Sequence, residues 1–281
     1  MIKFILSILK NTFNLFWKLF SYKLKKNIEF KNKHKGETCI IIANGGSLKY
    51  FDISKLPNIP KIGCTYSLID NRLKQNALNY CIFSDSYLLY PFRQHSYKNS
   101  IQRNFIELIL KKLVNNNSNT IFFTSLTNCL AFFQTPKNVR FFHHFGNKNN
   151  DLFDLTKIYN MSNGALSIMI GVAKYMGFKK AILIGCDYLG SPKYEGHFYA
   201  KDIPKIGKDD LFYSTQIKNV SKNIEIICLF RKGVKAIDFD FSSFEDFYNT
   251  PEYYKQNFEI IDKDYLQMMK RLYKNEQSTY I

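Results

Sequence analysis

Glycine and small polar residues that suit a phosphate or sugar site gather in three short segments of the chain. These segments are Asn44-Gly45-Gly46-Ser47, Ser162-Asn163-Gly164 and Gly185-Cys186-Asp187. Glycines let the main chain turn sharply and approach a ligand closely, and a helix that begins at a Ser or Asn cap offers free N–H groups to an anion. The three segments predict a site for a nucleotide or another phosphate compound. An ordinary tight turn and an ordinary capped helix explain the first two segments equally well.

These segments lie where secondary-structure elements are expected to begin or end. Apolar runs predict strands at 38–43, 60–64, 79–83, 120–124, 139–143, 180–185 and 224–229, and helical patterns cover 101–113 and 164–176. Such alternation predicts an α/β fold, a Rossmann-like and mainly parallel sheet with helices on both faces. The carboxyl edge of such a sheet is where ligands bind, and all three segments are expected to meet there.

The chain divides into two parts by composition. Residues 1–36 form a basic, amphipathic segment, and residues 37–281 form the Rossmann-like domain. Within that domain, residues 188 to about 220 are rich in Gly, Pro, Lys, Asp and Tyr and are expected to form a small lid over the site. A last amphipathic helix is expected at 251–274, with its apolar residues in the core.

The overall charge of the protein indicates an anionic partner. The 281 residues include 40 Lys and Arg against 23 Asp and Glu, a net charge of +17. Nucleic acid, anionic lipid and a phosphate-bearing substrate would each suit this excess. No nucleic-acid-binding motif is present, so no nucleic acid partner is expected. The six cysteines show no CxxC spacing and mostly lie in apolar runs, which predicts buried thiols in a reduced cytosolic protein.

The first 26 residues are expected to associate with a membrane surface. On a helix, their Lys residues form a narrow face and Ile, Leu, Phe and Trp17 form a broad apolar face. Lys10 and Lys18 interrupt the apolar run, and no cleavage site follows, which argues against a bilayer span or a signal peptide. We therefore expect a cytoplasmic protein held peripherally on the inner face of the cell membrane. Packing of this helix on the protein's own core or in a homo-oligomer interface stays open.

Three stretches of the chain resemble a known family. "IIANGGSLKYFDISKLPN" resembles the opening of the bacterial lipooligosaccharide sialyltransferases, "NGALSIMIGVAKYMGFKKAILIGCDYLG" resembles a later segment of theirs, and "FSDSYLL" resembles the end of their third strand. The resemblance covers residues 38–90 and 160–200 well. It extends to a wider group named after 6-hydroxymethylpterin pyrophosphokinase, many of which share the "HFY" that is found here at 197–199.

The resemblance implies a set of residues that bind a CMP-sugar donor. Asn44 and Gly45 match family residues that contact the nucleotide phosphate and sugar, and Asn163-Gly164 match a Ser-Gly pair that holds the donor. Asp85 stands where the family has an Asn after the third strand, and Thr65 replaces an Asn after the second. The complete set of expected substrate-binding residues is Asn44, Gly45, Gly46, Ser47, Thr65, Asp85, Ser162, Asn163, Gly164 and Asp187.

The expected catalytic residues are one histidine and a tyrosine. Transfer from a CMP-sugar needs a base for the acceptor hydroxyl and donors that stabilise the departing phosphate. His197 is the expected base, although the family's catalytic His lies farther along the lid. The family's phosphate-assisting Tyr follows the Asp strand, where this chain has Tyr188-Leu189, so Tyr188, Tyr194 or Tyr199 supplies that hydroxyl.

No metal or other cofactor is expected. Asp238-Phe239-Asp240 has the DxD form that binds divalent cations in many nucleotide-sugar enzymes, but it lies outside the strand-end segments. His143 and His144 are adjacent on a strand and point to opposite faces. Arg231 and Lys232, after the strand at 224–229, could meet a phosphate or an acidic sugar or lie in a solvated loop.

The expected function is therefore transfer of a nonulosonic acid, such as sialic acid, from a CMP-sugar to a glycolipid or surface-polysaccharide acceptor. One alternative is pyrophosphoryl transfer from ATP, with Mg²⁺, in the same pocket. Another is a non-enzymatic protein that binds nucleic acid through its basic surface.

Overall fold

The structure is a computed structural model that describes residues 18–73, 78–85, 100–132, 134–145, 153–160, 164–200, 205–209 and 211–273. Its centre is a nine-stranded sheet in the order β13-β11-β7-β1-β2-β3-β4-β5-β6, in which every pairing is parallel. The strands are β1 (Thr38–Ile42), β2 (Lys61–Cys64), β3 (Tyr80–Phe83), β4 (Ile121–Ser125), β5 (Val139–Phe145), β6 (Ile158–Asn160), β7 (Lys180–Ile184), β11 (Glu225–Phe230) and β13 (Asp240–Ser243). The predicted Rossmann-like α/β fold is confirmed.

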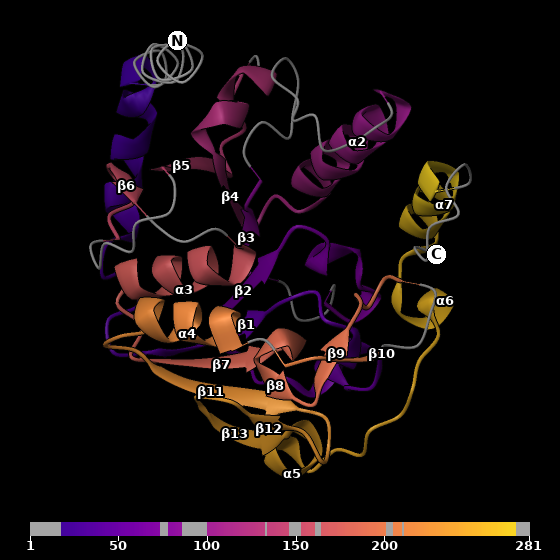
Figure 1. The fold of residues 1–281 in the computed structure, drawn as a ribbon. Coiled ribbons are helices and arrows are strands. Elements are labelled where there is room, and N and C mark those ends of the chain that lie inside the picture. The colour runs from indigo at the N-terminus through magenta and orange to yellow at the C-terminus, as the bar shows by residue number, and fades with distance from the viewer. Residues whose placement is uncertain are drawn as a thin grey trace, which may run out of the picture.

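Helices cover both faces of this sheet (Figure 1). One face carries α3 (Ala165–Tyr175) and α4 (Leu211–Val220), which pack against each other. The other carries α2 (Ser100–Asn116), α5 (Phe244–Tyr248), α6 (Asn257–Ile260) and α7 (Lys263–Tyr273), with α2 against α7. The central strand β1 supplies both layers, because Cys39 and Ile41 join one apolar core while Ile40 and Ile42 join the other.

The sheet order changes direction between β1 and β7. From β1 the chain adds β2, β3, β4, β5 and β6 on one side, then crosses back so that β7 pairs with the free edge of β1. Parallel sheets of this kind open a crevice beyond the carboxyl ends of the two strands at such a reversal. The candidate site lies in this crevice, at the carboxyl ends of β1 and β7.

Short elements complete the fold. The 3₁₀ helix η1 (Ser21–Phe30) lies against β5, and η2 (Gly46–Lys49) follows β1. Further 3₁₀ turns are η3 (Ile53–Lys55), η4 (Ser67–Ile69), η5 (Asn71–Leu73), η6 (Leu126–Ala131) and η7 (Asp187–Leu189). Two small antiparallel pairs join β8 (Gly190–Ser191) to β12 (Lys235–Ala236) and β9 (Lys193–Glu195) to β10 (Lys205–Gly207).

Two expectations about local structure are corrected. Residues 211–220, predicted as part of an irregular lid, form α4, whose buried Ser214 and Ile217 face the sheet side. The predicted continuous helix at 251–274 is instead an extended stretch at 251–256 followed by α6 and α7. Phe258, which was placed in the core, is 70% exposed.

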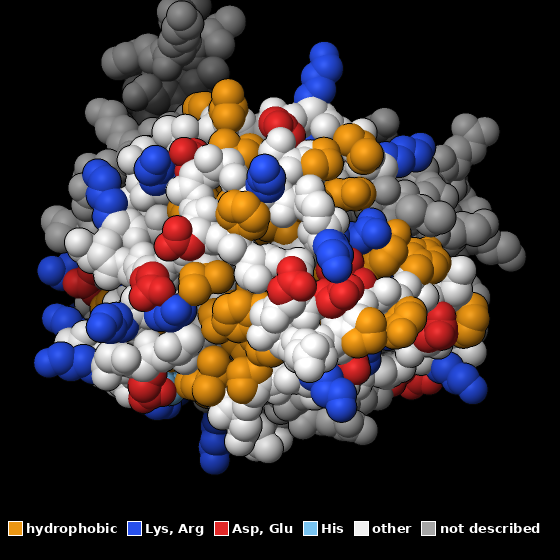
Figure 2. Space-filling view, turned by 90° about the horizontal axis from the view of Figure 1, so that it is seen from below, with side chains coloured by type: hydrophobic (Ala, Val, Ile, Leu, Met, Phe, Trp, Pro, Cys, Tyr) orange, Lys and Arg blue, Asp and Glu red, His pale blue; other side chains and the backbone are white. Residues whose placement is uncertain are grey.

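The expected membrane-associating helix lies mostly outside the described residues, which begin at 18. Within the part of the chain that the structure describes, no helix has the length and apolar character needed to cross a bilayer. All six cysteines are buried free thiols. The face formed around α5, β12 and β13 mixes basic, acidic and hydrophobic side chains (Figure 2), so this face does not concentrate the positive charge of the protein.

Candidate functional site

A cavity of about 140 Å³ lies at the carboxyl ends of β1 and β7, beside the start of α3. It is at the point where the order of the strands reverses. Segments far apart in the sequence therefore supply its walls. The residues that line it are Ala43, Asn44, Gly45, Cys64, Ala165, Leu166, Met169, Gly185, Cys186, Tyr188, His197 and Tyr213.

The glycine turn after β1 acts mainly as a structural joint. The Gly45 N–H donates to Gly185 O at 2.8 Å, and the Gly46 N–H donates to Gly196 O at 3.2 Å. A Cβ at Gly45 would lie 2.4 Å from Gly185 O and 2.6 Å from an Asp187 carboxylate oxygen, so only glycine fits there. These N–H groups are already bonded within the protein. Asn44 Oδ1 accepts from the Ser67 hydroxyl at 3.2 Å, so the NH₂ group of Asn44, rather than the turn's N–H groups, is what the segment offers to a ligand.

Ser47 and Asp187 join the first segment to the third. Asp187 is buried and accepts hydrogen bonds from the Ser47 N–H at 2.8 Å and from the Ser47 hydroxyl. Burial raises the pKa of Asp187 to about 6, against the lowering effect of the Ser47 hydrogen bonds and the positive charge of Arg231. The expected role of Asp187 in binding ribose or sugar is not what this geometry favours, because the carboxylate is turned into the joint between β1 and β7.

His197 is fixed against the first segment through its main chain. It forms an isolated antiparallel bridge with Gly45, and the next residue, Phe198, donates its N–H to Asn44 O at 3.0 Å. The imidazole stacks on the Tyr199 ring, with centroids 4.9 Å apart, and lines the cavity. Burial lowers the pKa of His197, partly opposed by a hydrogen bond with the Asn44 main chain. A neutral imidazole near pH 7 is the form that accepts a proton.

Two tyrosines line the cavity, but only one of them, Tyr188, was among the three expected from the sequence. The other two expected tyrosines do not line it. Tyr188 and Tyr213 are both in the cavity wall, with ring centroids 6.1 Å apart. Tyr199 is buried behind His197 with its edge against Tyr66, and Tyr194 packs near Arg231. The sequence analysis does not single out Tyr213, because the Gly-, Pro- and Lys-rich composition of 188–220 predicts a lid instead of a helix. The spacing of Tyr213, Ile217 and Val220 at helical intervals was the available signal.

The first turn of α3 closes another side of the cavity. Ala165 and Leu166 line it, and the first N–H groups of an α-helix have no partner within the helix. Gly164 precedes the helix with a φ of 125°, a conformation that favours glycine. The predicted Ser162 and Asn163 lie outside the described residues.

Thr65 and Asp85 stand next to the cavity. Thr65 follows the cavity residue Cys64 and donates its N–H to Ile82 O at 2.9 Å, with a φ of 30°. Asp85 follows the neighbouring strand β3, and its main-chain oxygen accepts from Asn128. Burial raises the pKa of the Cys64 thiol to about 12, and the negative charge of Asp85 adds to this rise. These two predicted residues thus occupy the ends of the next strands along the same edge.

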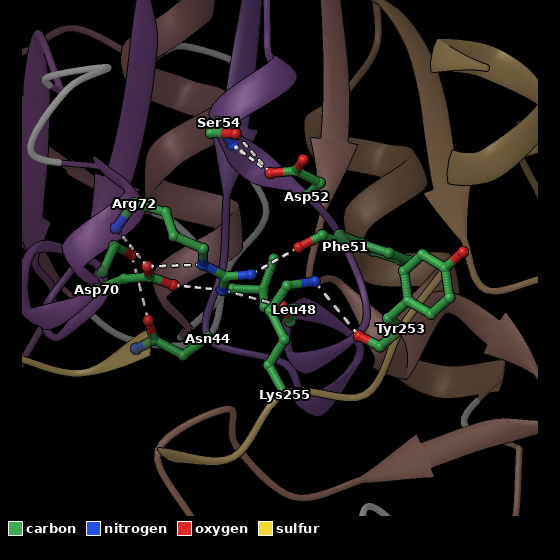
Figure 3. A network of polar contacts seen from close by, with 10 residues as sticks. Asn44, Leu48, Phe51, Asp52, Ser54, Asp70, Arg72, Tyr253 and Lys255 are labelled. Carbon is green, nitrogen blue, oxygen red and sulfur yellow. Dashed lines mark hydrogen bonds and ion pairs between the residues drawn. The ribbon is translucent and has the colours of Figure 1, made fainter. Parts of the chain in front are cut away.

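An arginine that the sequence did not single out holds the segment after the glycine turn (Figure 3). Arg72 makes two hydrogen bonds to the buried carboxylate of Asp70, at 2.9 and 2.6 Å. Its other donors reach Phe51 O at 2.6 Å and Leu48 O at 3.0 Å. Arg72 therefore positions η2, which carries Ser47, without itself lining the cavity.

A second arginine lies behind the joint between β1 and β7. The guanidinium of Arg231 stacks 3.6 Å from the Tyr50 ring centroid and pairs with Glu252 at 3.6 Å. It thus acts as a bridge between segments, and Lys232 pairs with Glu245 on the surface.

The DxD sequence does not line the cavity. Asp238 accepts hydrogen bonds from Ser214 and Lys218, and Asp240 begins the edge strand β13. His143 is buried on β5, the fourth strand from β1. Among the described residues no group of three or more His, Cys, Asp or Glu side chains is arranged to hold a metal ion.

Comparison with solved structures returns sialyltransferases at low similarity. The sialyltransferase CstII from Campylobacter jejuni with the substrate analogue CMP-3FNeuAc shares 14% identity over 81% of this chain and 91% of its own, with a TM-score of 0.43. The same enzyme with cytidine-5'-monophosphate shares 14% identity over 88% of this chain and 99% of its own, with a TM-score of 0.43. CST-II with a trisaccharide acceptor and CMP shares 16% identity over 81% of this chain and 91% of its own, with a TM-score of 0.39. No protein-family model and no curated protein matches this chain.

Proposed function

We propose that this protein is a glycosyltransferase that moves a nonulosonic acid, sialic acid or a relative, from a CMP-sugar to a carbohydrate acceptor. The observation that carries the proposal is the cavity at the reversal of the strand order. It brings together Asn44, His197, Tyr188, Tyr213 and the first turn of α3. The strand and helix motifs that surround it are the ones that resemble the lipooligosaccharide sialyltransferases.

The chemistry of transfer assigns two jobs to the walls of this cavity. The bond between the sugar and the CMP phosphate breaks through an oxocarbenium-like state, and negative charge accumulates on the departing phosphate. The first-turn N–H groups of α3 and the hydroxyls of Tyr188 and Tyr213, from residues that line the cavity, would stabilise that charge. Asn44 supplies an amide to orient the donor.

His197 takes the proton of the acceptor hydroxyl in this proposal. Its lowered pKa keeps the imidazole neutral near pH 7. The main-chain bridge to Gly45 fixes its position relative to the donor segment. Gly46, Ser47 and Asp187 act as supports beneath the donor. Thr65, Asp85 and Gly164 remain proposed donor contacts, as do Ser162 and Asn163, which lie outside the described residues.

We further propose a division of the chain that suits a membrane-bound acceptor. Residues 1–26, within a basic segment at 1–36, would hold the enzyme peripherally on the cytoplasmic face of the membrane. The lid expected at 188 to about 220 of the domain at 37–281 would be the part that precedes α4, since α4 packs against α3. The acceptor would be a glycolipid or a surface polysaccharide.

Nucleotide-dependent thermal stability tests this function. Full-length protein is melted with CMP, CDP, UDP, GDP or ATP, each with and without Mg²⁺, since a ligand that binds only the folded state raises the melting temperature. Selective, metal-independent stabilisation by CMP, followed by release of CMP from CMP-sialic acid with a sugar acceptor, is the expected result. Stabilisation by ATP with Mg²⁺ alone would replace the proposal with pyrophosphoryl transfer. Salt-sensitive DNA binding with no nucleotide effect would replace it with a nucleic-acid-binding role.

A further inference from the structure

A second pocket, far from the candidate active site, is lined by basic side chains. It has a volume of about 370 Å³ and lies between η1 and the beginning of β5. Its basic residues are Lys23, Lys26, Lys137 and Arg140, and its described lining contains no carboxylate. β5 is the fourth strand from β1 in the sheet, and Lys137 precedes its first residue, so this pocket lies toward the amino edge of the sheet, opposite the cavity.

The walls of this basic pocket are built by buried and directional contacts. The buried side chain of Asn27 donates to Phe141 O at 2.6 Å and to Leu155 O at 2.8 Å, which fixes η1 along β5. Arg140 pairs with Glu29 of η1 at 2.6 Å and donates to Lys137 O at 2.7 Å. Arg140 therefore connects the two walls, and its own charge is largely matched by Glu29.

Three ammonium groups remain for a ligand. The Lys23 Nζ lies 5.6 Å from the centroid of the Phe141 ring, which directs the half-buried side chain along the pocket wall. Lys26 and Lys137 are exposed. Within the described residues, no carboxylate forms an ion pair with any of these three lysines. Three uncompensated ammonium groups around one concavity fit a compact anion with several oxygens, such as a phosphate.

The surroundings of the pocket distinguish a lipid phosphate from a soluble one. Leu19, Tyr22 and Ile28, on the same segment as Lys23 and Lys26, are 71%, 58% and 60% exposed. Large apolar side chains beside a basic pocket are the combination that binds the boundary between headgroups and acyl chains. A soluble phosphate compound would have no use for them.

We propose that the pocket formed by Lys23, Lys26, Lys137 and Arg140 binds the phosphate of an anionic membrane lipid. This site adds a specific lipid contact to the described part of the chain and does not depend on the identity of the sugar donor. It places the membrane against η1 and the start of β5.

A pair of charge-matched double variants of the full-length protein tests the proposal. Lys26→Gln with Lys137→Gln removes two pocket charges, both on exposed side chains, so the fold is kept. Lys25→Gln with Lys222→Gln removes two exposed lysines that do not line the pocket. Each protein is sedimented with vesicles of equal parts phosphatidylglycerol and phosphatidylcholine, or of phosphatidylcholine alone.

The expected result is a loss of about tenfold or more in affinity for the anionic vesicles in the pocket variant, with a much smaller loss in the control. Equal losses in the two variants would overturn the proposal, because the charges would then act only in sum. Melting with inorganic phosphate and with glycerol 1-phosphate forms the second arm. Stabilisation by these soluble compounds, together with vesicle binding that the pocket variant retains, would overturn the assignment to a lipid.

Discussion

Gly45 and His197 pair through their main chains, so the segment that follows the first strand and the segment that carries the proposed base form one unit. The same glycine lies under the carboxylate of Asp187 and the carbonyl of Gly185. The donor side and the base side of the cavity therefore depend on one residue that has no side chain.

Replacement of Gly45 by Ala is expected to disrupt the site as well as the fold. The added methyl group would meet Gly185 O and Asp187 at distances below 3 Å, and overpacking of this kind costs about 1–3 kcal/mol of unfolding free energy. Chemical denaturation measures this loss, and melting with CMP measures the accompanying loss of binding. A variant with wild-type stability and CMP binding would contradict the close packing described for this turn.

His197 is expected to set the acid limb of the pH–rate profile. Burial lowers its pKa, so the neutral base persists to a pH below the ordinary value of 6.5, and kcat/KM should fall only on the acid side of that value. His197→Gln should lower kcat by about 10²–10⁴-fold, the usual contribution of a general base. CMP-induced stabilisation of the variant serves as the control for folding and donor binding. An acid limb that survives in the variant would assign the base to another residue.

Tyr188 and Tyr213 are expected to contribute through their hydroxyl groups. Tyr188→Phe and Tyr213→Phe should each lower kcat by about 10²-fold, which is the effect of removing one donor that stabilises developing negative charge. Tyr253→Phe is the matched control, since Tyr253 is 66% exposed and does not line the cavity. Steady-state release of CMP from CMP-sialic acid measures all three. Equal rates for all three variants would remove both hydroxyls from the mechanism.

Asp187 is expected to make stability fall as the pH rises from about 4 to about 6. Its folded-state pKa is raised from 3.8 to about 6, so the folded protein holds a proton over this interval that the unfolded chain releases. At 1.36 kcal/mol per pKa unit, the loss is on the order of 3 kcal/mol. Asp187→Asn keeps an oxygen that can accept from the Ser47 N–H and should lack this pH dependence. Denaturation at several pH values compares the two proteins, and identical slopes would contradict the raised pKa.

Removal of Arg72 is expected to destabilise the protein strongly. Arg72→Ala leaves the buried carboxylate of Asp70 without its partner, which costs about 3–5 kcal/mol for a buried pair. Lys232→Ala, which breaks the surface pair with Glu245, should cost less than about 1 kcal/mol. Urea denaturation of both variants measures the difference. Similar losses would show that Arg72 is not a support of η2.

The central strands were predictable because burial on both faces leaves a strong trace in the sequence. Runs such as Cys39–Ile42 and Ala181–Ile184 are apolar without interruption, and their ends were located to within about two residues. The edge strands β6 and β13 were missed because they are short and carry polar residues, as with Asp240 and Ser242. Edge strands need fewer apolar side chains.

Three residues that line the cavity were singled out from the sequence: Asn44 and Tyr188 because they follow predicted strands, and His197 because it is a histidine in the expected lid. The sequence does not reveal the role of a residue whose contacts depend only on tertiary packing. Arg72 looks like an ordinary charged residue in a turn, and only the fold brings its guanidinium to Leu48 O and Phe51 O. Asp187 has the sequence context of a ligand contact. In the fold its carboxylate instead accepts hydrogen bonds from Ser47 and packs against Gly45, so it holds the turn after β1.

The position of β1 between β2 and β7 has a consequence for synthesis of the protein. A chain is made from its amino end, and domains begin to fold as they emerge. β1 and β2 are complete early, but the other edge of β1 stays uncovered until residues 180–184 leave the ribosome. The bond from Ser47 to Asp187 spans 140 residues and cannot form before then. A chain that ends before residue 180 therefore leaves the main-chain N–H and C=O groups on this edge of β1 without their β7 partners and lacks Asp187, so the cavity at the β1–β7 joint can form only after synthesis has passed this point.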